Sequence, residues 1–329
     1  MIEDRLQVDV ASPEDVAASG MTYLPGGVFT MGSNRFYPEE SPRREVKVAP
    51  FWIDERPVTN AAFRSFVEAT GHVTFAEIAP DPMDYPGMLP ELAQPGSLVF
   101  EKTDGPVDLR DYGQWWRFCL GADWRHPWGP DSGIEGMDEH PVVQIGYADA
   151  LAFAKWAGKE LPTEAEWEFA ARGGLENTEY AWGDELAPDG RILANYWQGA
   201  FPYDPGSGVR WERTSPVGSY PGNGYGLLDM IGNTWEWTSD WWSLPSIPKK
   251  PFKGACCIPA NPRGGKERNS YDPCTPQVKV GRKVLKGGSH LCAPSYCQRY
   301  RPAARHAQPI DSPASHIGFR CVKRANETA

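Results

Sequence analysis

Long hydrophobic runs and clusters of basic residues are both missing from this sequence. No stretch approaches the roughly 18 consecutive apolar residues that a membrane-spanning helix needs, and the mean hydropathy is -0.52. The 33 Lys and Arg residues are outnumbered by 43 Asp and Glu, which gives a net charge of -10, and they form no block. Because nucleic acids and anionic membranes attract clustered positive charge, we expect neither as a partner.

The sequence also lacks the composition of a helical bundle. Its 34 Gly and 32 Pro residues interrupt regular structure, and no internal repeat or low-complexity linker is present. Loops and turns should therefore dominate the fold. The 14 Trp, 13 Tyr and 13 Phe residues predict a rigid core and a cleft lined with aromatic side chains.

Cysteine usage and the first residues of the chain indicate the compartment. Seven Cys is an odd number, so we expect no full disulfide framework and a reducing environment. The opening MIEDRLQVDVASPEDVAASG carries acids where a secretion signal needs basic residues and then an apolar run. We therefore expect a cytoplasmic protein, with residues 1–20 as a loose arm before a single domain over 21–325.

Alternating β-formers predict two strands near the start of this domain, over 23–33 and 46–55. High Pro and Gly content predicts an irregular excursion over 79–111. The same features, with many charges, predict a loop inserted in the domain at about 245–283. The strands should therefore be short and widely spaced.

Three helices are predicted. The first should begin after Thr59, whose side chain can cap it, and end at Gly71. The second should cover about 148–157, and the third is marked by a capping box formed by Thr163 and Glu166. The apolar side chains expected to cover the first two helices are Phe63, Phe66 and Val67, and Leu151, Phe153, Ala154 and Trp156.

Cys292 and Cys297 are candidates for metal chemistry. They lie five residues apart, so on a strand or a helix they point in different directions and only a bend, such as Pro294 can supply, brings the sulfurs together. Two soft thiolates suit Cu(I), which accepts low coordination, whereas structural zinc takes four ligands. His290 and His306 would complete a zinc set. Two buried thiols without a metal are the third possibility.

The segment from Asp229 to Glu236 is a second candidate metal site. Its two carboxylates lie seven residues apart, and Gly232 between them permits a tight curl. Side-chain oxygens together with the carbonyls of Gly232 and Thr234 would wrap a hard cation. A turn with solvated acids is the alternative.

Several motifs between about Leu24 and Cys321 are similar to those of one known family. They are LPTEAEWE over 161–168, GLLDMIGNTWEW over 226–237, GGSHLCAPSYC over 287–297, GFRC over 318–321, WRHP over 124–127, NYWQG over 195–199 and RYR over 299–301. They resemble the signatures of the formylglycine-generating enzyme, or sulfatase-modifying factor, family in its bacterial form. The resemblance implies one α+β domain with a C-type-lectin-related fold and little regular secondary structure.

The resemblance also implies an activity. Members of this family convert a cysteine in a Cys-x-Pro-x-Arg segment of a sulfatase to formylglycine with O2 and Cu(I), and the substrate thiolate is expected to be the third copper ligand. Copper is assigned to the two cysteines of the GGSHLCAPSYC motif. The residues implied in catalysis are Cys292, Cys297, Ser289, Tyr296 and Trp235, and those implied in substrate binding are Arg305 and His316.

Calcium is the second cofactor that the resemblance implies. The corresponding ligands are Asp229, Gly232, Thr234 and Glu236 for one ion, and Asn195 and Tyr196 for another, whose later Asp position is Val209 here. Positions that pair in disulfides of secreted members are Ala154, Ala170 and Pro302 here, which leaves Cys321 alone. A non-catalytic ligand-binding module of the same fold is the alternative function, with Trp235 and Tyr296 as core aromatic residues.

Overall fold

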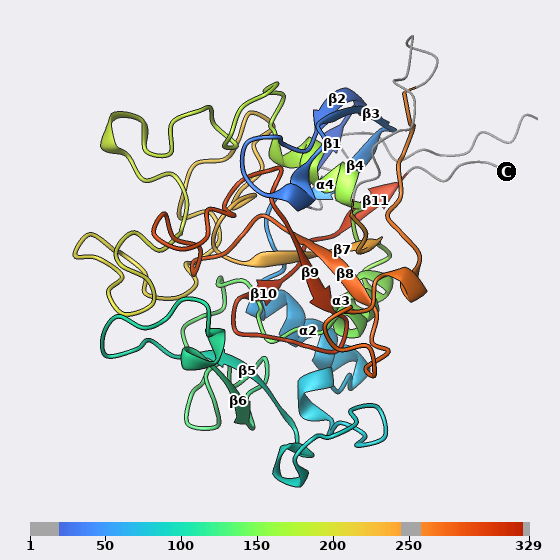
Figure 1. Cartoon of the computed structure of the whole chain (residues 1–329). Helices are drawn as coiled ribbons and strands as arrows, with labels where there is room; N and C mark the ends of the chain where they lie inside the picture. The colour runs from blue at the N-terminus through green and yellow to red at the C-terminus, as the bar shows by residue number, and fades with distance from the viewer. Residues whose placement is uncertain (1–19, 245–257, 325–329) are drawn as a thin grey trace, which may run out of the picture.

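The computed structural model describes residues 20–244 and 258–324, which are coloured in Figure 1. Residues 1–19 of the predicted arm and residues 245–257 of the predicted loop, which include Cys256 and Cys257, lie outside these ranges. Three α-helices and a set of short strands are joined by long segments without regular structure. The prediction of a mixed fold with little regular secondary structure is confirmed.

The elements of this fold are short. The strands are β1 (Met21–Leu24), β2 (Gly27–Met31), β3 (Arg44–Val48), β4 (Phe51–Asp54), β5 (Gly96–Phe100), β6 (Trp116–Leu120), β7 (Trp235–Trp241), β8 (Arg282–Lys286), β9 (Arg305–Pro309), β10 (Ile317–Gly318) and β11 (Val322–Arg324). The α-helices are α2 (Asn60–Thr70), α3 (Tyr147–Trp156) and α4 (Glu164–Ala171).

The strands of the described ranges form four sheets. In a three-stranded sheet, β4 lies between β1 and β11 and is antiparallel to both. A four-stranded sheet has the order β10-β7-β8-β9, in which β10 is parallel to β7 and the other pairs are antiparallel. The pairs β2-β3 and β5-β6 form the remaining two sheets. The first and last strands in Figure 1 therefore meet on the two edges of β4.

Each of the two strands predicted near the N-terminus is divided in two, so that prediction was wrong in its boundaries. The breaks fall at Gly26 and at Ala49, and they face each other: a Cβ on Gly26 would collide with the backbone of Val48 and Ala49. Only glycine allows this close approach, and its φ of 67° suits glycine as well. The excursion predicted over 79–111 was also incomplete, because it contains strand β5.

All three predicted helices are present. Helix α2 begins after Thr59, whose Oγ1 accepts a hydrogen bond from the Ala62 amide at 3.3 Å, and it ends at Gly71, which has a φ of 68°. Helix α4 has the predicted capping box. The Glu166 amide donates to Thr163 Oγ1 at 3.1 Å, and the Thr163 amide donates to Glu166 Oε2 at 2.7 Å. Local sequence signals therefore fix both helix starts.

The apolar cover predicted for α3 was partly wrong. Leu151 and Trp156 are 48% and 44% exposed, whereas Ala150, Phe153 and Ala154 are buried. The helix packs on the core along one narrow face, so apolar residues on its other faces stay in solvent. None of the helices in the described part of the chain is long and apolar enough to cross a membrane.

Tryptophan rings are prominent in the core, as predicted. Trp167 and Trp237 are wholly buried, and each indole nitrogen has a partner. Trp237 Nε1 donates to the Ile145 carbonyl at 2.9 Å, and Trp167 Nε1 donates to Glu236 Oε2 at 2.7 Å. Trp235 belongs to the same buried cluster, so the candidate site is built directly on the core.

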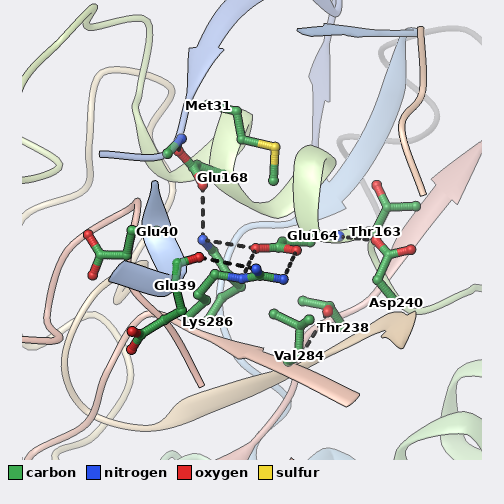
Figure 2. Close-up of polar contacts among 12 residues, drawn as sticks. Met31, Glu39, Glu40, Thr163, Glu164, Glu168, Thr238, Asp240, Val284 and Lys286 are labelled. Carbon is green, nitrogen blue, oxygen red and sulfur yellow. Dashed lines mark hydrogen bonds and ion pairs between the residues drawn. The ribbon is translucent and has the colours of Figure 1, made fainter. Parts of the chain in front are cut away.

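Buried charges anchor α4 to the four-stranded sheet (Figure 2). Lys286 of β8 is fully buried, and its Nζ lies 2.9 Å from Glu168 and 3.8 Å from Glu164. Arg305 of β9 pairs with Glu164 at 2.8 Å, and Arg172 pairs with Glu168 at 2.6 Å. Each carboxylate thus faces cations that offset the cost of its burial.

Replacing Glu168 with Gln should remove part of the acid sensitivity of the fold. Burial acts to raise the pKa of Glu168, but Lys286 and Arg172 lower it to about 2, below the ordinary 4.5. The carboxylate therefore stabilises the fold fully above about pH 4.5, and its contribution is lost as the pH falls toward 2. At pH 7 the Gln variant should lose about 3–5 kcal/mol of unfolding free energy, because two buried cations lose a partner. Urea unfolding at several pH values measures both effects, and identical pH profiles for the two proteins would contradict them.

Candidate active site

The two candidate copper-binding cysteines lie in the loop after β8. This loop begins with Gly287 and Gly288, whose φ angles of 94° and 70° favour glycine. A Cβ on Gly288 would approach the Arg299 carbonyl group to 2.6 Å, so the loop folds back closely on itself. The glycine pair therefore turns the chain out of the sheet and into the site.

The loop before β7 holds this segment in place. The Gly232 amide donates to the Gly287 carbonyl at 2.9 Å. The backbone amide and Nδ1 of His290 both donate to the Asn233 carbonyl, at 3.0 and 2.8 Å. The Asn233 amide donates in turn to the Asn195 carbonyl at 2.8 Å. Three segments that are far apart in the sequence are thereby fixed to one another.

Cys292 and Cys297 are both free thiols, and each shifts the pKa of the other, so the two side chains lie close together. Cys292 is buried, and the Ser289 amide donates to its Sγ at 3.4 Å. Cys297 is half-buried. Between them, a turn is closed by a hydrogen bond from the Tyr296 amide to the Ala293 carbonyl at 3.1 Å. A bend of the backbone therefore brings the two sulfurs together.

The two thiols have opposite pKa shifts. Burial acts to raise the pKa of Cys292, but hydrogen bonds from the Cys297 thiol and the Ser289 amide, together with the charge and amide of Arg299, lower it below 9.0. The pKa of Cys297 is raised well above that value, because its thiol donates to Cys292 and is desolvated although the residue is only half-buried. The Cys292 thiol therefore loses its proton more easily than an ordinary thiol, whereas loss of the proton of Cys297 needs a cation that compensates the added charge.

An aromatic wall lies beside the cysteine pair. The ring of Tyr296 stacks on Phe201, with centroids 4.6 Å apart and 5° between the planes, and it meets Trp115 edge-on at 5.6 Å. Burial raises the pKa of Tyr296 to about 12, so its hydroxyl stays protonated at neutral pH. Tyr296 is nevertheless 39% exposed, and the neighbouring Ser295 is exposed. The wall thus borders the side of the loop that faces solvent.

Ser289, Trp235 and His316 lie at different depths. Ser289 is fully buried, and its Oγ accepts a backbone hydrogen bond at 3.2 Å. Trp235 is buried, with its ring centroid 5.8 Å from that of His306. The His316 carbonyl accepts a hydrogen bond from the Trp235 amide at 2.9 Å, and its ring lies 4.7 Å from that of Trp116. The protein therefore holds Trp235 and His316 together through the backbone.

The histidines near the site do not assemble a zinc set. Burial lowers the pKa of both predicted zinc ligands, His290 and His306, to about 4, so both rings are neutral at pH 7. In residues 20–244 and 258–324, no group of three or more His, Cys, Asp or Glu side chains is placed to hold a metal ion. The two cysteines remain a two-sulfur site, which fits Cu(I) and not four-coordinate zinc.

Arg305, which the resemblance implies in substrate binding, has its guanidinium engaged within the protein. It pairs with Glu164 through Nε and Nη2, at 2.8 and 2.9 Å. Its Nη1 donates to the carbonyls of Glu39 and Ser243, at 3.2 and 2.9 Å. The guanidinium also lies 4.5 Å from the Trp242 ring. All three of its nitrogens therefore contact protein groups, and its role in substrate binding stays a prediction.

Sequence reasoning gave no role to Tyr37, Glu39 and Arg299, which gather at Cys297. Arg299 pairs with Glu39 at 2.6 Å, and its guanidinium lies 4.0 Å from the centre of the Tyr37 ring. Tyr37 Oη accepts a hydrogen bond at 3.2 Å from the amide that follows Cys297. The RYR motif over 299–301 contains Arg299, but no sequence pattern connects it to residues near the other end of the chain.

The predicted calcium ligands Asp229 and Glu236 are buried, but protein donors occupy Glu236. Its two carboxylate oxygens accept hydrogen bonds from Arg320 at 2.8–3.0 Å, and Oε2 also accepts one from Trp167 Nε1 at 2.7 Å. Asp229 Oδ2 accepts from the Gly218 amide at 2.7 Å, and burial raises the pKa of Asp229 to about 6. A cation bound between the two carboxylates would therefore have to share Glu236 with Arg320 or displace it.

The other predicted calcium ligands come together with this segment. A Cβ on Gly232 would reach the Asn195 carbonyl at 2.5 Å, so the two predicted calcium segments touch. Thr234 and Tyr196 are buried, and Thr234 Oγ1 has no hydrogen-bond partner. Asn195 Nδ2 donates to the Arg213 carbonyl at 2.8 Å. The amide of Asn195 therefore serves here to hold the loop.

The fold is C-type-lectin-related, and the candidate site in it is a pair of cysteines in the loop after β8. Two solved structures share the fold: PvdO from Pseudomonas aeruginosa (TM-score 0.59, 22% identity, 93% of this chain and 94% of that one) and Treponema denticola variable protein 1 (TM-score 0.55, 17% identity, 93% and 95%). The model of the sulfatase-modifying factor enzyme 1-like domain matches residues 7–325, and the chain belongs to this family. The resemblance and the fold class predicted from the motifs are thereby confirmed.

Curated relatives cover nearly the whole chain. The formylglycine-generating enzyme of Mycobacterium tuberculosis is 55% identical over 299 residues, which are 91% of this chain and 96% of that protein. The enzyme of the same name from Streptomyces coelicolor is 43% identical over 341 residues, covering 97% and 98%. A mouse protein named inactive C-alpha-formylglycine-generating enzyme 2 is 36% identical over 317 residues, covering 93% and 86%.

Proposed function

We propose that this protein is an oxidoreductase that converts a cysteine in a Cys-x-Pro-x-Arg segment of a sulfatase to formylglycine, with O2 and a Cu(I) ion held by Cys292 and Cys297. The observation that carries the proposal is the close approach of these two free thiols. Two soft sulfur donors without a third protein ligand suit Cu(I), which accepts low coordination. The names of the bacterial relatives support the reaction.

Family membership alone does not decide the activity. One relative of this chain is named inactive, so a non-catalytic binding module is the second candidate. The arrangement of the cysteine pair favours an enzyme, because a module without metal chemistry gains little from two thiols held in contact at a bend. The lowered pKa of Cys292 favours the thiolate form that a metal ligand needs.

The protein residues around the pair orient the substrate and protect the site. When bound, copper would supply a position for the substrate sulfur and for O2. Cys292 is buried and Cys297 is half-buried, so a substrate thiol reaches the pair from the side of Cys297. Tyr296, held rigid by Phe201, forms a wall on this side and keeps a hydroxyl proton to donate.

Mass spectrometry of a peptide that contains Cys-x-Pro-x-Arg tests the proposal. After aerobic incubation with the copper-loaded protein, we expect the cysteine to lose its sulfur and to gain an aldehyde oxygen. The matched control is the same peptide with Ala in place of Arg, which should react much more slowly. An unmodified peptide that still binds the folded, copper-loaded protein would contradict the enzyme and favour the binding module.

Calcium remains a proposal for the segment from Asp229 to Glu236. If Ca2+ replaces Arg320 as the partner of Glu236, calcium should raise the melting temperature of chelator-treated protein, because it binds the native state. The expected gain is about 2.7 kcal/mol at 100 times the Kd. Asp229→Asn should abolish the rise. An unchanged melt across the calcium titration would contradict calcium binding and leave Arg320 as the permanent partner.

The chain contains Cys-x-Pro triplets of its own, but we expect no self-modification at the two outside the site. The position two residues after each Pro, where the substrate has Arg, holds another residue: Asn261 for Cys257, Val278 for Cys274 and Tyr296 for Cys292. Cys257 lies outside the described residues, and Cys274 is exposed. Only the planar guanidinium forms bidentate pairs with a carboxylate, and its loss typically costs about a hundredfold or more in specificity.

Peptide mapping after aerobic incubation with copper checks this expectation. Wild-type protein should carry no aldehyde at Cys257 or Cys274. Val278→Arg should turn the exposed segment around Cys274 into a weak substrate for other copies of the enzyme. An aldehyde at either cysteine in the wild-type protein would show that the Arg position is not required.

A further inference from the structure

A cation is fixed beside the cysteine pair. The guanidinium of Arg299 is held by Glu39 at 2.6 Å, by the Arg305 carbonyl at 2.6 Å and by the ring of Tyr37 at 4.0 Å. Its side chain is 18% exposed. Arg299 lies two residues after Cys297, and the hydroxyl of Tyr37 accepts a hydrogen bond at 3.2 Å from the amide that follows Cys297. The positive charge is therefore fixed next to the cysteine loop, with its position set from three sides.

The charges around Arg299 are matched in pairs. Glu40 binds Arg301 through two hydrogen bonds, at 2.8 and 2.5 Å, in a pair that is fully buried. Arg305 is matched by Glu164. Glu39, the partner of Arg299, is as exposed as Arg299 itself, at 18% each, so water screens both charges to the same degree. Arg299 belongs to the loop of the cysteines, two residues after Cys297, and its positive charge lowers the pKa of both thiols. The guanidinium therefore acts on the two sulfurs directly, and Glu39 opposes it.

Metal binding changes the charge at this place. Two thiols are neutral, whereas two thiolates with one Cu(I) carry one negative charge in total. Placing a charge at a site where one sulfur is buried is unfavourable unless a counter-charge lies nearby. Arg299 supplies the counter-charge, and Glu39 reduces it.

We infer that Arg299 is a positioning residue whose charge strengthens Cu(I) binding by Cys292 and Cys297, and that Glu39 moderates this effect. The inference rests on the proposed function, because it concerns the affinity of the site for copper. Arg299 and Glu39, the two partners of one ion pair, should therefore have opposite effects on the affinity for Cu(I). A purely structural role would make the removal of either partner harmful.

Competition with a chromophoric Cu(I) chelator, without O2, measures the affinity independently of turnover. Arg299→Gln should weaken Cu(I) binding by about tenfold, because the counter-charge is lost. Arg299→Lys keeps the charge and should stay within about threefold of the wild type. Glu39→Gln keeps an oxygen acceptor for Arg299 but removes the negative charge, and it should tighten binding by about threefold or more.

Thermal melting of the metal-free variants separates charge from folding. Both Arg299 variants lose the fork that binds Glu39 and the Arg305 carbonyl, so both should lower the melting temperature by similar amounts. A difference in copper affinity between Arg299→Gln and Arg299→Lys then results from the charge and not from lost stability. Equal affinities in all variants, or weaker binding by Glu39→Gln, would overturn the inference alone. Failure of the wild-type protein to bind Cu(I) would instead refute the proposed function and this inference with it.

Discussion

Replacing either Cys292 or Cys297 with serine should abolish formylglycine formation and weaken Cu(I) binding by orders of magnitude. A neutral hydroxyl cannot replace a soft thiolate as a copper ligand. Each substitution also removes the thiol that is hydrogen-bonded to the remaining cysteine. Chelator competition measures the affinity, and mass spectrometry of a Cys-x-Pro-x-Arg peptide measures the reaction.

Cys274→Ser is the matched control for these two variants. Cys274 is also a free thiol, but it is exposed and lies in the segment before β8. Its replacement should leave both copper affinity and turnover at wild-type values. Full turnover by either Cys292→Ser or Cys297→Ser would contradict the proposed site.

Replacing Arg320 with Met should destabilise the protein by about 3–5 kcal/mol, because it leaves the buried carboxylate of Glu236 without its cation. Both side chains of this pair are at most 1% exposed. Arg320 also donates to the carbonyls of Leu228 and Asp54, at 2.8 and 3.3 Å, so its removal breaks contacts between three segments. Urea unfolding of the metal-free protein measures the loss.

A double-mutant cycle and a surface control separate the ion pair from general effects. Glu236→Gln combined with Arg320→Met should be less destabilised than the sum of the two single variants, because no unpaired charge remains. Arg110→Met removes a pair with Asp108 on the surface, where Arg110 is 90% exposed, and it should leave stability nearly unchanged. Additive effects in the buried pair would contradict the account.

The helices could be predicted because their signals are local. The capping residues Thr59 and Thr163 act within one helical turn of themselves, so the sequence alone determines both starts. The divided strands could not be predicted in this way. The break at Gly26 exists because the chain meets Val48 there, and that contact depends on how the strands pair. The exposure of Trp156 could not be predicted for a related reason, because the burial of an apolar side chain depends on the whole fold.

The same distinction between local and distant contacts applies to the candidate site. The motifs found the loop that holds Cys292 and Cys297, since the two residues lie close in sequence. They did not predict that Arg320 would occupy Glu236, because the two side chains come from distant segments. They also did not predict that Glu39 would reach Arg299 from near the N-terminus. Each of these partners is a charged side chain that forms its ion pair only in the folded protein.

The strand order of the three-stranded sheet also bears on synthesis. Strand β4 receives β1 from one side and β11 from the other, so the sheet joins residues from both ends of the described chain. A chain leaves the ribosome N-terminal end first, and contacts between distant residues form slowly. The three-stranded sheet can therefore be completed only after Val322 has been synthesised, and Glu39 can form its ion pair only after Arg299 has been synthesised. On a growing chain, the loop that contains Cys292 and Cys297 contacts its partners only when most of the protein has been made.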